Sequence, residues 1–326
     1  MPRDAAFSAR PAPRFVMVAL LGLGVTLLLF YVYNGLSAET WGYTFPRRVK
    51  VVIAIGMVSA AIGASSVIFQ TITANHILTP SIMGLDNLFL FLQTLVVYLF
   101  GSGQLVLMND LPSFILTLLL MIGFSVALFL LLFRGEGQNI YFLVLVGLVL
   151  GTAFSGLSSF MQVVIDPSEF SVLEGRMFAS FNKINVDLLG VASVVIVGTI
   201  LWLLSEFRSL DVLTLGRAHA IPLGVDYRKV VLKALIATAT LTSAATVLVG
   251  PITFLGILIV SLARLLFRTY RHAVLVPGTI AVGVAVLGFG MCATERVLHF
   301  IAPLSVIINF VGGVYFIYLL LRMRHP

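Results

Sequence analysis

The chain has 326 residues, of which 60% are hydrophobic and 10% are charged, and its mean hydropathy is +1.11. Soluble globular proteins carry about 25% charged residues, so this composition excludes a water-facing surface and indicates one that faces lipid. The formal net charge is +7, but the sequence has no basic run with interleaved aromatic residues, which argues against a nucleic-acid partner. The single cysteine, Cys292, excludes an internal disulfide.

Apolar runs of about 20 residues, the length that a spanning helix needs, recur along nearly the whole sequence. They predict an all-α integral membrane protein, a single transmembrane domain over residues 1–326 with about ten transmembrane helices. In chain order, the expected spans are 15–33, 49–71, 80–100, 111–133, 139–165, 186–205, 229–249, 251–267, 272–291 and 303–321. The first run is too long for a typical signal-peptide core, so we expect an uncleaved helix there.

Lysine and arginine residues predict the orientation, because they are enriched in cytoplasmic loops. With the N-terminus inside and the spans alternating in direction, most of the 20 Lys and Arg residues fall on the inner side. We therefore expect both termini in the cytoplasm, with a short inner tail at residues 1–14. The polar segment 206–228 becomes an inner loop suited to holding a partner protein, and the long mixed segment 166–187 lies outside.

Sequence signatures of catalysis are absent. The chain contains no HExxH, no GxSxG and no glycine-rich phosphate loop with its lysine. We expect no catalytic residues, metal ligands or cofactor, and no ATP hydrolysis by this chain. Asp86 is the main ionisable residue inside an expected span, where a charge is costly. It is interpreted as a helix cap or buried pair, with a gating role as the alternative.

Small residues at close-approach spacing mark the span 139–165. Gly147 and Gly151 form a GxxxG pattern, and Ser155 extends the same face. Such faces let helices touch in lipid. Packing inside the bundle is the favoured interpretation, and a dimer face is the alternative.

Residues 69–84 read FQTITANHILTPSIMG. The segment resembles the one between the second and third helices of the FecCD permeases, MQxxxxNPLAxPxxLG, with Leu78 displaced by one position and His76 where the family usually has proline. We expect this segment and the span 139–165 to line the translocation path. The expected path or gate residues are Gln70, Asn75, Pro80, Gly84 and Asp86.

Residues 215–225 read LGRAHAIPLGV and resemble the family pattern LGxxxAxxLGV. In the family this segment is the coupling helix region that contacts the ATPase. Two glycines bracket a short helix here, and Ala220 and Leu223 are expected to give it a small apolar face for a groove on the partner. The implied coupling residues are Leu215, Gly216, Arg217, Ala220, Leu223 and Gly224.

Residues 250–264 read GPITFLGILIVSLAR and resemble GPIxFxGLxxPHxxR, except that Val260 and Ser261 replace the Pro-His pair. This departure, with the run MGLDN at residues 83–87, resembles the branch that handles catecholate-type siderophores. The family docks a binding protein on permease arginines. Arg48, before the second span, and Arg296, after the ninth, match such positions, whereas a further family arginine falls on Phe45 here and Arg47 is its expected substitute. Generic anchoring at the membrane interface is the alternative for these arginines.

The resemblance implies the fold of a large-type ABC importer permease in the bacterial inner membrane. Its implied partners are a cytoplasmic ABC ATPase dimer, a second permease subunit (a paralogue in preference to a copy) and a siderophore-binding protein outside. Cobalamin and haem are alternative cargoes. A secondary transporter would be expected to carry intramembrane charges and an inverted repeat, and a membrane enzyme would need a catalytic constellation. The sequence displays neither.

Overall fold

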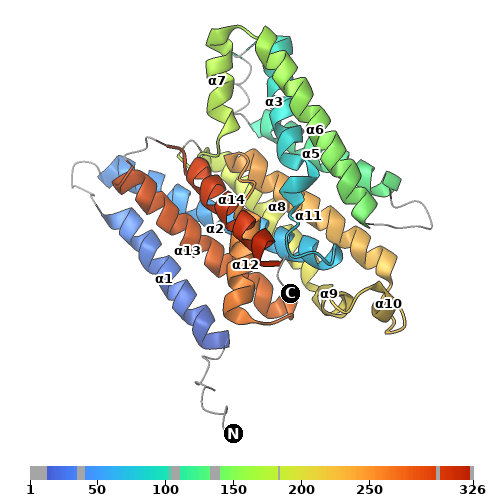
Figure 1. Ribbon diagram of the computed structural model, residues 1–326. Coiled ribbons are helices and arrows are strands. Elements are labelled where there is room, and N and C mark those ends of the chain that lie inside the picture. The colour runs from blue at the N-terminus through green and yellow to red at the C-terminus, as the bar shows by residue number, and fades with distance from the viewer. Residues whose placement is uncertain are drawn as a thin grey trace.

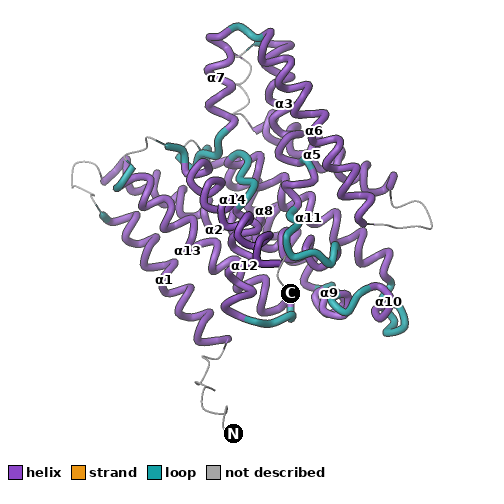
Figure 2. Tube along the Cα trace, in the orientation of Figure 1, coloured by secondary structure: helices purple, strands orange, loops and turns teal. Residues whose placement is uncertain are grey.

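The computed structural model describes residues 13–34, 41–101, 103, 111–132, 140–182, 184–298 and 302–323. These residues form helices and loops, and the described part of the chain contains no strand (Figures 1 and 2). The elements are α1 (Pro13–Tyr33), α2 (Trp41–Ile72), η1 (Pro80–Met83), α3 (Leu85–Phe100), α5 (Leu111–Leu132), α6 (Ile140–Val164), α7 (Pro167–Met177), α8 (Val186–Leu204), α9 (Phe207–Leu213), α10 (Arg217–Ala220), α11 (Tyr227–Val249), α12 (Leu255–Phe267), α13 (His272–Arg296) and α14 (Leu304–Met323).

Within the described residues, seven helices are long and apolar enough to cross a membrane, and three shorter apolar helices accompany them. The seven are α1, α2, α5, α6, α8, α11 and α13, and the shorter ones are α3, α12 and α14. The predicted all-α membrane architecture with about ten spans is confirmed. Residues 1–12 of the expected tail, and residues 133 and 139 at the ends of two expected spans, lie outside the described residues.

Some span boundaries differ from the expected ones. Helix α2 begins at Trp41 and continues through the basic residues before residue 51, and α13 extends to Arg296. Both helices are longer than their apolar runs, because the backbone hydrogen bonds of a helix can continue through polar residues. The expected spans 80–100 and 251–267 are both interrupted near their first residues. Gly84 at φ +83° separates η1 from α3, and residues 250–254 precede α12 without regular structure.

Within the described residues, helices α2 and α13 pack extensively on each other. They run antiparallel, since Ser59 lies against Gly283 and Gly63 lies against Thr279. Small residues allow the close approach: a Cβ added to Gly283 would lie 3.0 Å from Ser59 Cβ, and one added to Gly63 would lie 3.3 Å from Thr279 Cγ2. In lipid, such van der Waals packing is the main force between helices. Helix α1 covers the other side of α13 (Figure 1).

Helices α3 and α6 pack through glycine. A Cβ added to Gly84 would lie 2.6 Å from Gly151 Cα, and one added to Gly147 would lie 3.1 Å from Met83 O. Asn87 Nδ2 donates to Gly151 O at 3.0 Å. The GxxxG pattern therefore serves packing inside the chain, as the favoured interpretation predicted.

The two ends of the bundle differ in what they carry. Helix α7 lies at one end with the upper parts of α3 and α6, while α9, α10 and the first turns of α1 lie at the opposite end (Figure 1). We call the end with α9 and α10, where the sequence predicts the contact with the ATPase, the coupling end. We call the end with α7, which the sequence predicts to face outside, the outer end. The motif at residues 215–225 therefore lies at one end of the bundle, and helix α7 of the segment 166–187 lies at the other end.

Candidate functional site

Two apolar helices of the bundle, α3 and α12, are too short to cross a membrane alone. Helix α3 has 16 residues and α12 has 13, or about 24 and 20 Å at 1.5 Å per residue, against a hydrocarbon core of about 30 Å. The segments 73–84 and 250–254 precede them. Irregular backbone is tolerated at membrane depth where it is buried in protein or lines a cavity, so these segments are candidates for the path.

The two irregular segments meet at Asp86. The carboxylate of this residue, 6% exposed in the first turn of α3, accepts from Thr253 Oγ1 at 2.9 Å and from Thr246 Oγ1 at 3.5 Å. A helix N-terminus favours a negative charge. Asp86 thus ties α3 to the end of α11 and the segment after it, which agrees with the interpretation of a buried pairing residue.

The other predicted path residues have distinct environments. Gln70 is fully buried, and neither its amide oxygen nor its amide nitrogen has a hydrogen-bond partner in the described part of the chain. Asn75 Oδ1 accepts from Ile77 N at 2.9 Å and shapes the turn after α2. Pro80 begins η1, and Gly84 packs on α6. Of the two polar side chains among these residues, Asn75 is used in a turn, whereas the buried amide of Gln70 makes no hydrogen bond within the described residues.

Helix α6 carries a polar strip on its exposed surface. Thr152, Ser155 and Ser159 are all exposed, and their spacing of three and four residues places them on one side of the helix. The exposed neighbours are large and apolar, including Leu148 and Phe160. Sequence reasoning singled out the helix and Ser155 but missed the other two hydroxyls, which the 3,4 spacing within an apolar run could have indicated.

The coupling end presents a short helix between two glycines. Gly216 and Gly224 adopt φ of +88° and +85°, a conformation that is strained for residues with a Cβ. Ala220 between them is fully buried, and its carbonyl accepts from Val225 N at 3.2 Å. Ala220 thus anchors the loop to the protein and does not belong to its exposed apolar surface.

The exposed apolar surface of this loop includes three large aliphatic side chains. Leu215 is 59% exposed, Ile221 is 50% exposed and Leu223 is 62% exposed. Arg217, also exposed, lies with its guanidinium 5.2 Å from the centre of the Tyr227 ring. Sequence reasoning missed Ile221, although a large apolar residue in a polar loop was a usable signal. We call Leu215, Ile221 and Leu223 the coupling surface.

A hydrogen-bond chain links the coupling end to the core. Asp211 Oδ1, on α9, accepts from the backbone N of His272 at 2.7 Å and lies 2.6 Å from His272 Nδ1. Because a carboxylate only accepts, Nδ1 carries the proton. On the other side of the ring, Nε2 lies 2.9 Å from Thr71 Oγ1 on α2. Three elements, α9, α13 and α2, therefore meet at one buried imidazole. Sequence reasoning missed this chain.

At the outer end, Arg48 is a structural residue in this conformation. It is 8% exposed, and its Nη2 lies 2.6 Å from Glu295 Oε1. Its Nη1 donates to Val32 O at 3.0 Å and to Asn34 O at 2.7 Å. Arg48 thus ties α2 to α1 and α13, and its guanidinium is engaged in contacts within the chain.

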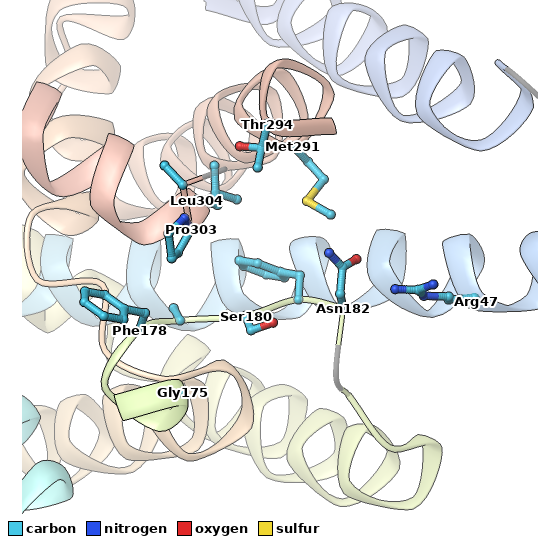
Figure 3. A pocket seen from close by; sticks show the side chains of 12 residues that line it. Arg47, Gly175, Phe178, Ser180, Asn182, Met291, Thr294, Pro303 and Leu304 are labelled. Atoms are coloured by element: carbon cyan, nitrogen blue, oxygen red, sulfur yellow. The ribbon is translucent and has the colours of Figure 1, made fainter. Parts of the chain in front are cut away.

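The two other predicted docking arginines are exposed. Arg296 Nη2 donates to Asn34 O, and Arg47 lines two adjoining hollows. One, about 480 Å³, is also lined by Phe178 and Met291. The other, about 430 Å³, is also lined by Lys50. Figure 3 shows Arg47 at one end of the first hollow and Phe178 at the other. Together they form a groove with positive charge at the outer end.

Metal ligands are not gathered in this structure: among the described residues, no group of three or more His, Cys, Asp or Glu side chains could hold a metal ion. The candidate sites are the polar strip of α6 with the segments beside it and two surfaces at opposite ends of the bundle.

Comparisons with known proteins agree with this arrangement. Residues 14–322 match the FecCD transport family. The chain is 50% identical over 305 residues to the petrobactin import system permease protein YclO of Bacillus subtilis, covering 93% of this chain and 96% of YclO. It is 32% identical over 325 residues to FatC of Bacillus anthracis, also a petrobactin import system permease protein, covering 97% of this chain and 91% of FatC. FatD, of the same description and organism, is 26% identical over 95% of this chain and 91% of its own length.

A solved structure has the same fold. It is an inward-facing conformation of a metal-chelate type ABC transporter, with a TM-score of 0.81 and 23% sequence identity, covering 95% of this chain and 99% of that one.

Proposed function

The chain belongs to the FecCD transport family, and on this basis we propose that it is the transmembrane permease subunit of an ABC importer for ferric siderophores. The observation that carries the proposal is the 50% identity to a petrobactin import permease along nearly the whole of both chains. The family match covers residues 14–322, so path, coupling end and outer end all lie within it. The iron enters as a chelate, and no iron ligand is required of this chain.

The proposed cargo is a catecholate-type siderophore, with petrobactin as the first compound to test. Two relatives from two organisms carry petrobactin in their names. The replacement of the Pro-His pair by Val260 and Ser261 supports the same branch. A bulky chelate needs a wide path with weak contacts, since tight binding would hold the cargo in the membrane.

The proposed path runs along the polar strip of α6 and past the irregular segment 73–84. The strip gives hydroxyl groups to a surface that would otherwise be apolar, which favours contact with water and cargo over contact with lipid. Gln70 supplies an unused buried amide beside this segment, and Gly84 brings the segment against α6. Asp86 acts as the tie that holds the two irregular segments together.

The coupling surface is the proposed contact with a separate ATPase subunit, which hydrolyses the ATP. Leu215, Ile221 and Leu223 are exposed on a loop fixed at both ends by glycine turns. A small exposed apolar surface of this kind can bind in a groove on a partner. Arg217 lies beside the coupling surface and adds a positive charge.

The outer groove is the proposed dock for a siderophore-binding protein. Arg47 and Lys50 line it, and Arg296 is exposed at the end of α13. Positive charge on this surface favours a partner with acidic residues at the contact. Arg48 stabilises this surface indirectly, because its contacts hold α1, α2 and α13 together.

A second permease completes the proposed assembly, and we favour a paralogue. Bacillus anthracis has two different relatives of this chain, FatC and FatD, both named as petrobactin import permeases. The excess of Lys and Arg in the loops of the coupling end supports a cytoplasmic location for that end and for both termini. The subunit would then be a multi-pass protein of the bacterial cytoplasmic membrane.

The proposal is tested by uptake of radioactive iron in cells that lack only this chain. Iron is offered as its petrobactin, hydroxamate and citrate complexes, and the chain is restored as wild type or as Leu223→Asp. We expect loss of petrobactin-bound iron uptake, restored by the wild type and not by the variant. Normal uptake of every iron complex in the deleted cells would contradict the siderophore assignment and make cobalamin and haem the next cargoes to measure.

A further inference from the structure

Helices α2 and α13 are fastened to each other at both ends. At the outer end, Arg48 of α2 pairs with Glu295 of α13, with 2.6 Å between Nη2 and Oε1. At the coupling end, Thr71 of α2 lies 2.9 Å from the ring of His272 at the start of α13. The stretch of α2 between the two fastenings has 23 residue steps from Arg48 to Thr71, about 35 Å at 1.5 Å per residue. The two contacts are therefore separated along α2 by slightly more than the thickness of a hydrocarbon core, about 30 Å.

Between the fastenings the two helices are in close contact along their length. A Cβ on Gly283 would approach Ser59 Cβ to 3.0 Å, and a Cβ on Gly63 would approach Ile280 N to 3.5 Å. Packed interfaces of this kind have discrete arrangements and do not deform continuously. Sliding of one helix along the other would bring side chains into the space now left free by the glycines.

The pair is joined to the coupling end by one side chain. Asp211, on α9, bonds both the backbone N and the ring Nδ1 of His272, and so occupies the N-terminus of α13, whose preceding residue provides no side-chain cap. Helix α9 leads through Thr214 directly into the coupling surface at Leu215. A displacement of that surface by a partner would reach α13 through Asp211.

The far end of the pair carries the exposed docking arginines. Arg47 directly precedes Arg48 in α2, and Arg296 directly follows Glu295 in α13. Any movement of the pair as a unit would therefore move both arginines and the groove that Arg47 lines.

We propose that α2 and α13 move as one rigid pair during transport, and that Asp211 is the positioning residue through which the ATPase contact moves that pair. This inference rests on the proposed function, because it assigns the coupling surface to the ATPase and the groove to the binding protein. It makes the Asp211–His272–Thr71 chain the mechanical connection between hydrolysis at one end and docking at the other.

A cross-link between the two helices tests the rigid pair. In a Cys292→Ala background, Ser59→Cys and Gly283→Cys place two thiols at a point of close approach. The Cβ separation there, 3.0 Å, needs to widen only slightly to reach the value of about 3.8 Å that is usual for a disulfide. The complete importer is reconstituted in vesicles, and uptake of ferric petrobactin is measured after oxidation and again after reduction. We expect the oxidised and reduced importers to transport at the same rate. Loss of uptake on oxidation and recovery on reduction would overturn the rigid pair.

Substitution of Asp211 tests the connection independently of the cysteines. Asp211→Ala removes the acceptor for both His272 donors, whereas Asp211→Asn keeps a side-chain oxygen in its place. We expect the alanine variant to import about tenfold less iron per ATP hydrolysed, and the asparagine variant to retain most of the wild-type ratio. A merely structural role would lower the amount of folded importer and leave this ratio unchanged, and that result would overturn the proposal.

The hydroxyl of Thr71 has a matched control. Thr71→Val removes the contact with His272, while Thr240→Val removes a hydroxyl that bonds the carbonyl of Ile236 in its own helix. We expect the ratio of iron imported to ATP hydrolysed to fall for Thr71→Val and not for Thr240→Val. Equal ratios for the two variants would contradict a role of the Asp211–His272–Thr71 hydrogen bonds.

The proposed function and this inference can fail separately. If the wild-type importer carries no ferric siderophore, the proposed function is wrong. If the wild type transports and Asp211→Ala has the same ratio of iron to ATP, only this inference is wrong.

Discussion

The two ends of the α2–α13 pair are held by different chemistry. At the outer end, Arg48 and Glu295 form a nearly buried ion pair that also binds carbonyls of α1. At the coupling end, the ring of His272 lies between a hydroxyl of α2 and a carboxylate from a third element, α9. The outer contact joins the pair to α1 inside the bundle, whereas the contact at the coupling end joins the pair to α9, next to the proposed contact with the ATPase. Damage to the first should mainly lower stability, and damage to the second should mainly lower coupling.

The largest effect is expected at Arg48. Arg48→Glu leaves two acidic side chains facing each other where an ion pair is nearly buried, and removal of one partner from such a pair costs about 3 to 5 kcal/mol. Arg47→Glu is the matched control, since Arg47 is exposed and its replacement should change the free energy of unfolding by less than about 0.5 kcal/mol. Thermal unfolding in detergent measures both. Equal stability of the two variants would show that the outer contact does not hold the pair.

The same control variant tests the dock. Arg47→Glu should slow association with the siderophore-binding protein, with a larger effect at low salt, because charges at the rim of an interface act mainly on the association rate. Association rates at two salt concentrations measure this. Unchanged rates would remove Arg47 from the dock and leave Arg296 as the arginine to test.

The next effect is expected at the coupling surface. Leu223→Asp places a charge on an apolar contact and should weaken binding of the ATPase by about tenfold or more, whereas Leu223→Met should bind normally. Stability should stay within about 0.5 kcal/mol of the wild type in both, because the side chain is exposed. Co-purification of the ATPase with the permease separates the two variants, and retention of the ATPase by Leu223→Asp would exclude this residue from the contact.

A fourth test concerns Gln70, which directly precedes Thr71 at the coupling end of the α2–α13 pair. A buried amide without partners destabilises the fold, so Gln70→Leu should raise the stability by about 1 kcal/mol. If the amide serves the path, the same variant imports less cargo at an unchanged ATPase rate. Unfolding and uptake are measured on the same preparation, and a stabilised variant with full uptake would remove Gln70 from the path.

The smallest effect is expected at Asp166, which directly precedes α7 and belongs to neither helix of the pair. Its carboxylate caps α7, and hydrogen bonds from the Ser168 hydroxyl and backbone N–H lower the pKa of this group below its ordinary value of 3.8. The cap therefore contributes fully above pH 3.8 and is lost as the pH falls through the lower pKa of the folded state. Asp166→Ala should speed amide exchange in the first turn of α7 at neutral pH, and an unchanged rate would show that the cap contributes nothing.

The spans could be predicted because the thickness of a bilayer fixes the length of an apolar run. The breaks before α3 and α12 were harder to predict, since the apolar runs continue through them, although Gly84 and Pro251 mark the positions. The pairing role of Asp86 could be inferred from the cost of a buried charge.

Contacts between distant residues could not be read from the sequence. Glu295 follows Arg48 by 247 residues and His272 follows Asp211 by 61, and nothing in hydrophobic periodicity connects such positions. For the same reason, the motif match assigned Arg48 to docking and could not indicate that Arg48 pairs with Glu295. Ala220 lies in the coupling motif as expected, but its direction, into the protein, depends on the turn at Gly216.

The central claim concerns how α2 and α13 move, and distances between spin labels test it most directly. Labels replace Tyr43 on α2, Phe289 on α13 and Phe160 on α6, all exposed positions, in pairs and in the Cys292→Ala background. The reconstituted importer is measured without nucleotide and with a non-hydrolysable ATP analogue. The account predicts that the distance between α2 and α13 changes by less than about 2 Å while the distance from α13 to α6 changes by more. A larger change between α2 and α13 than between α13 and α6 would contradict it.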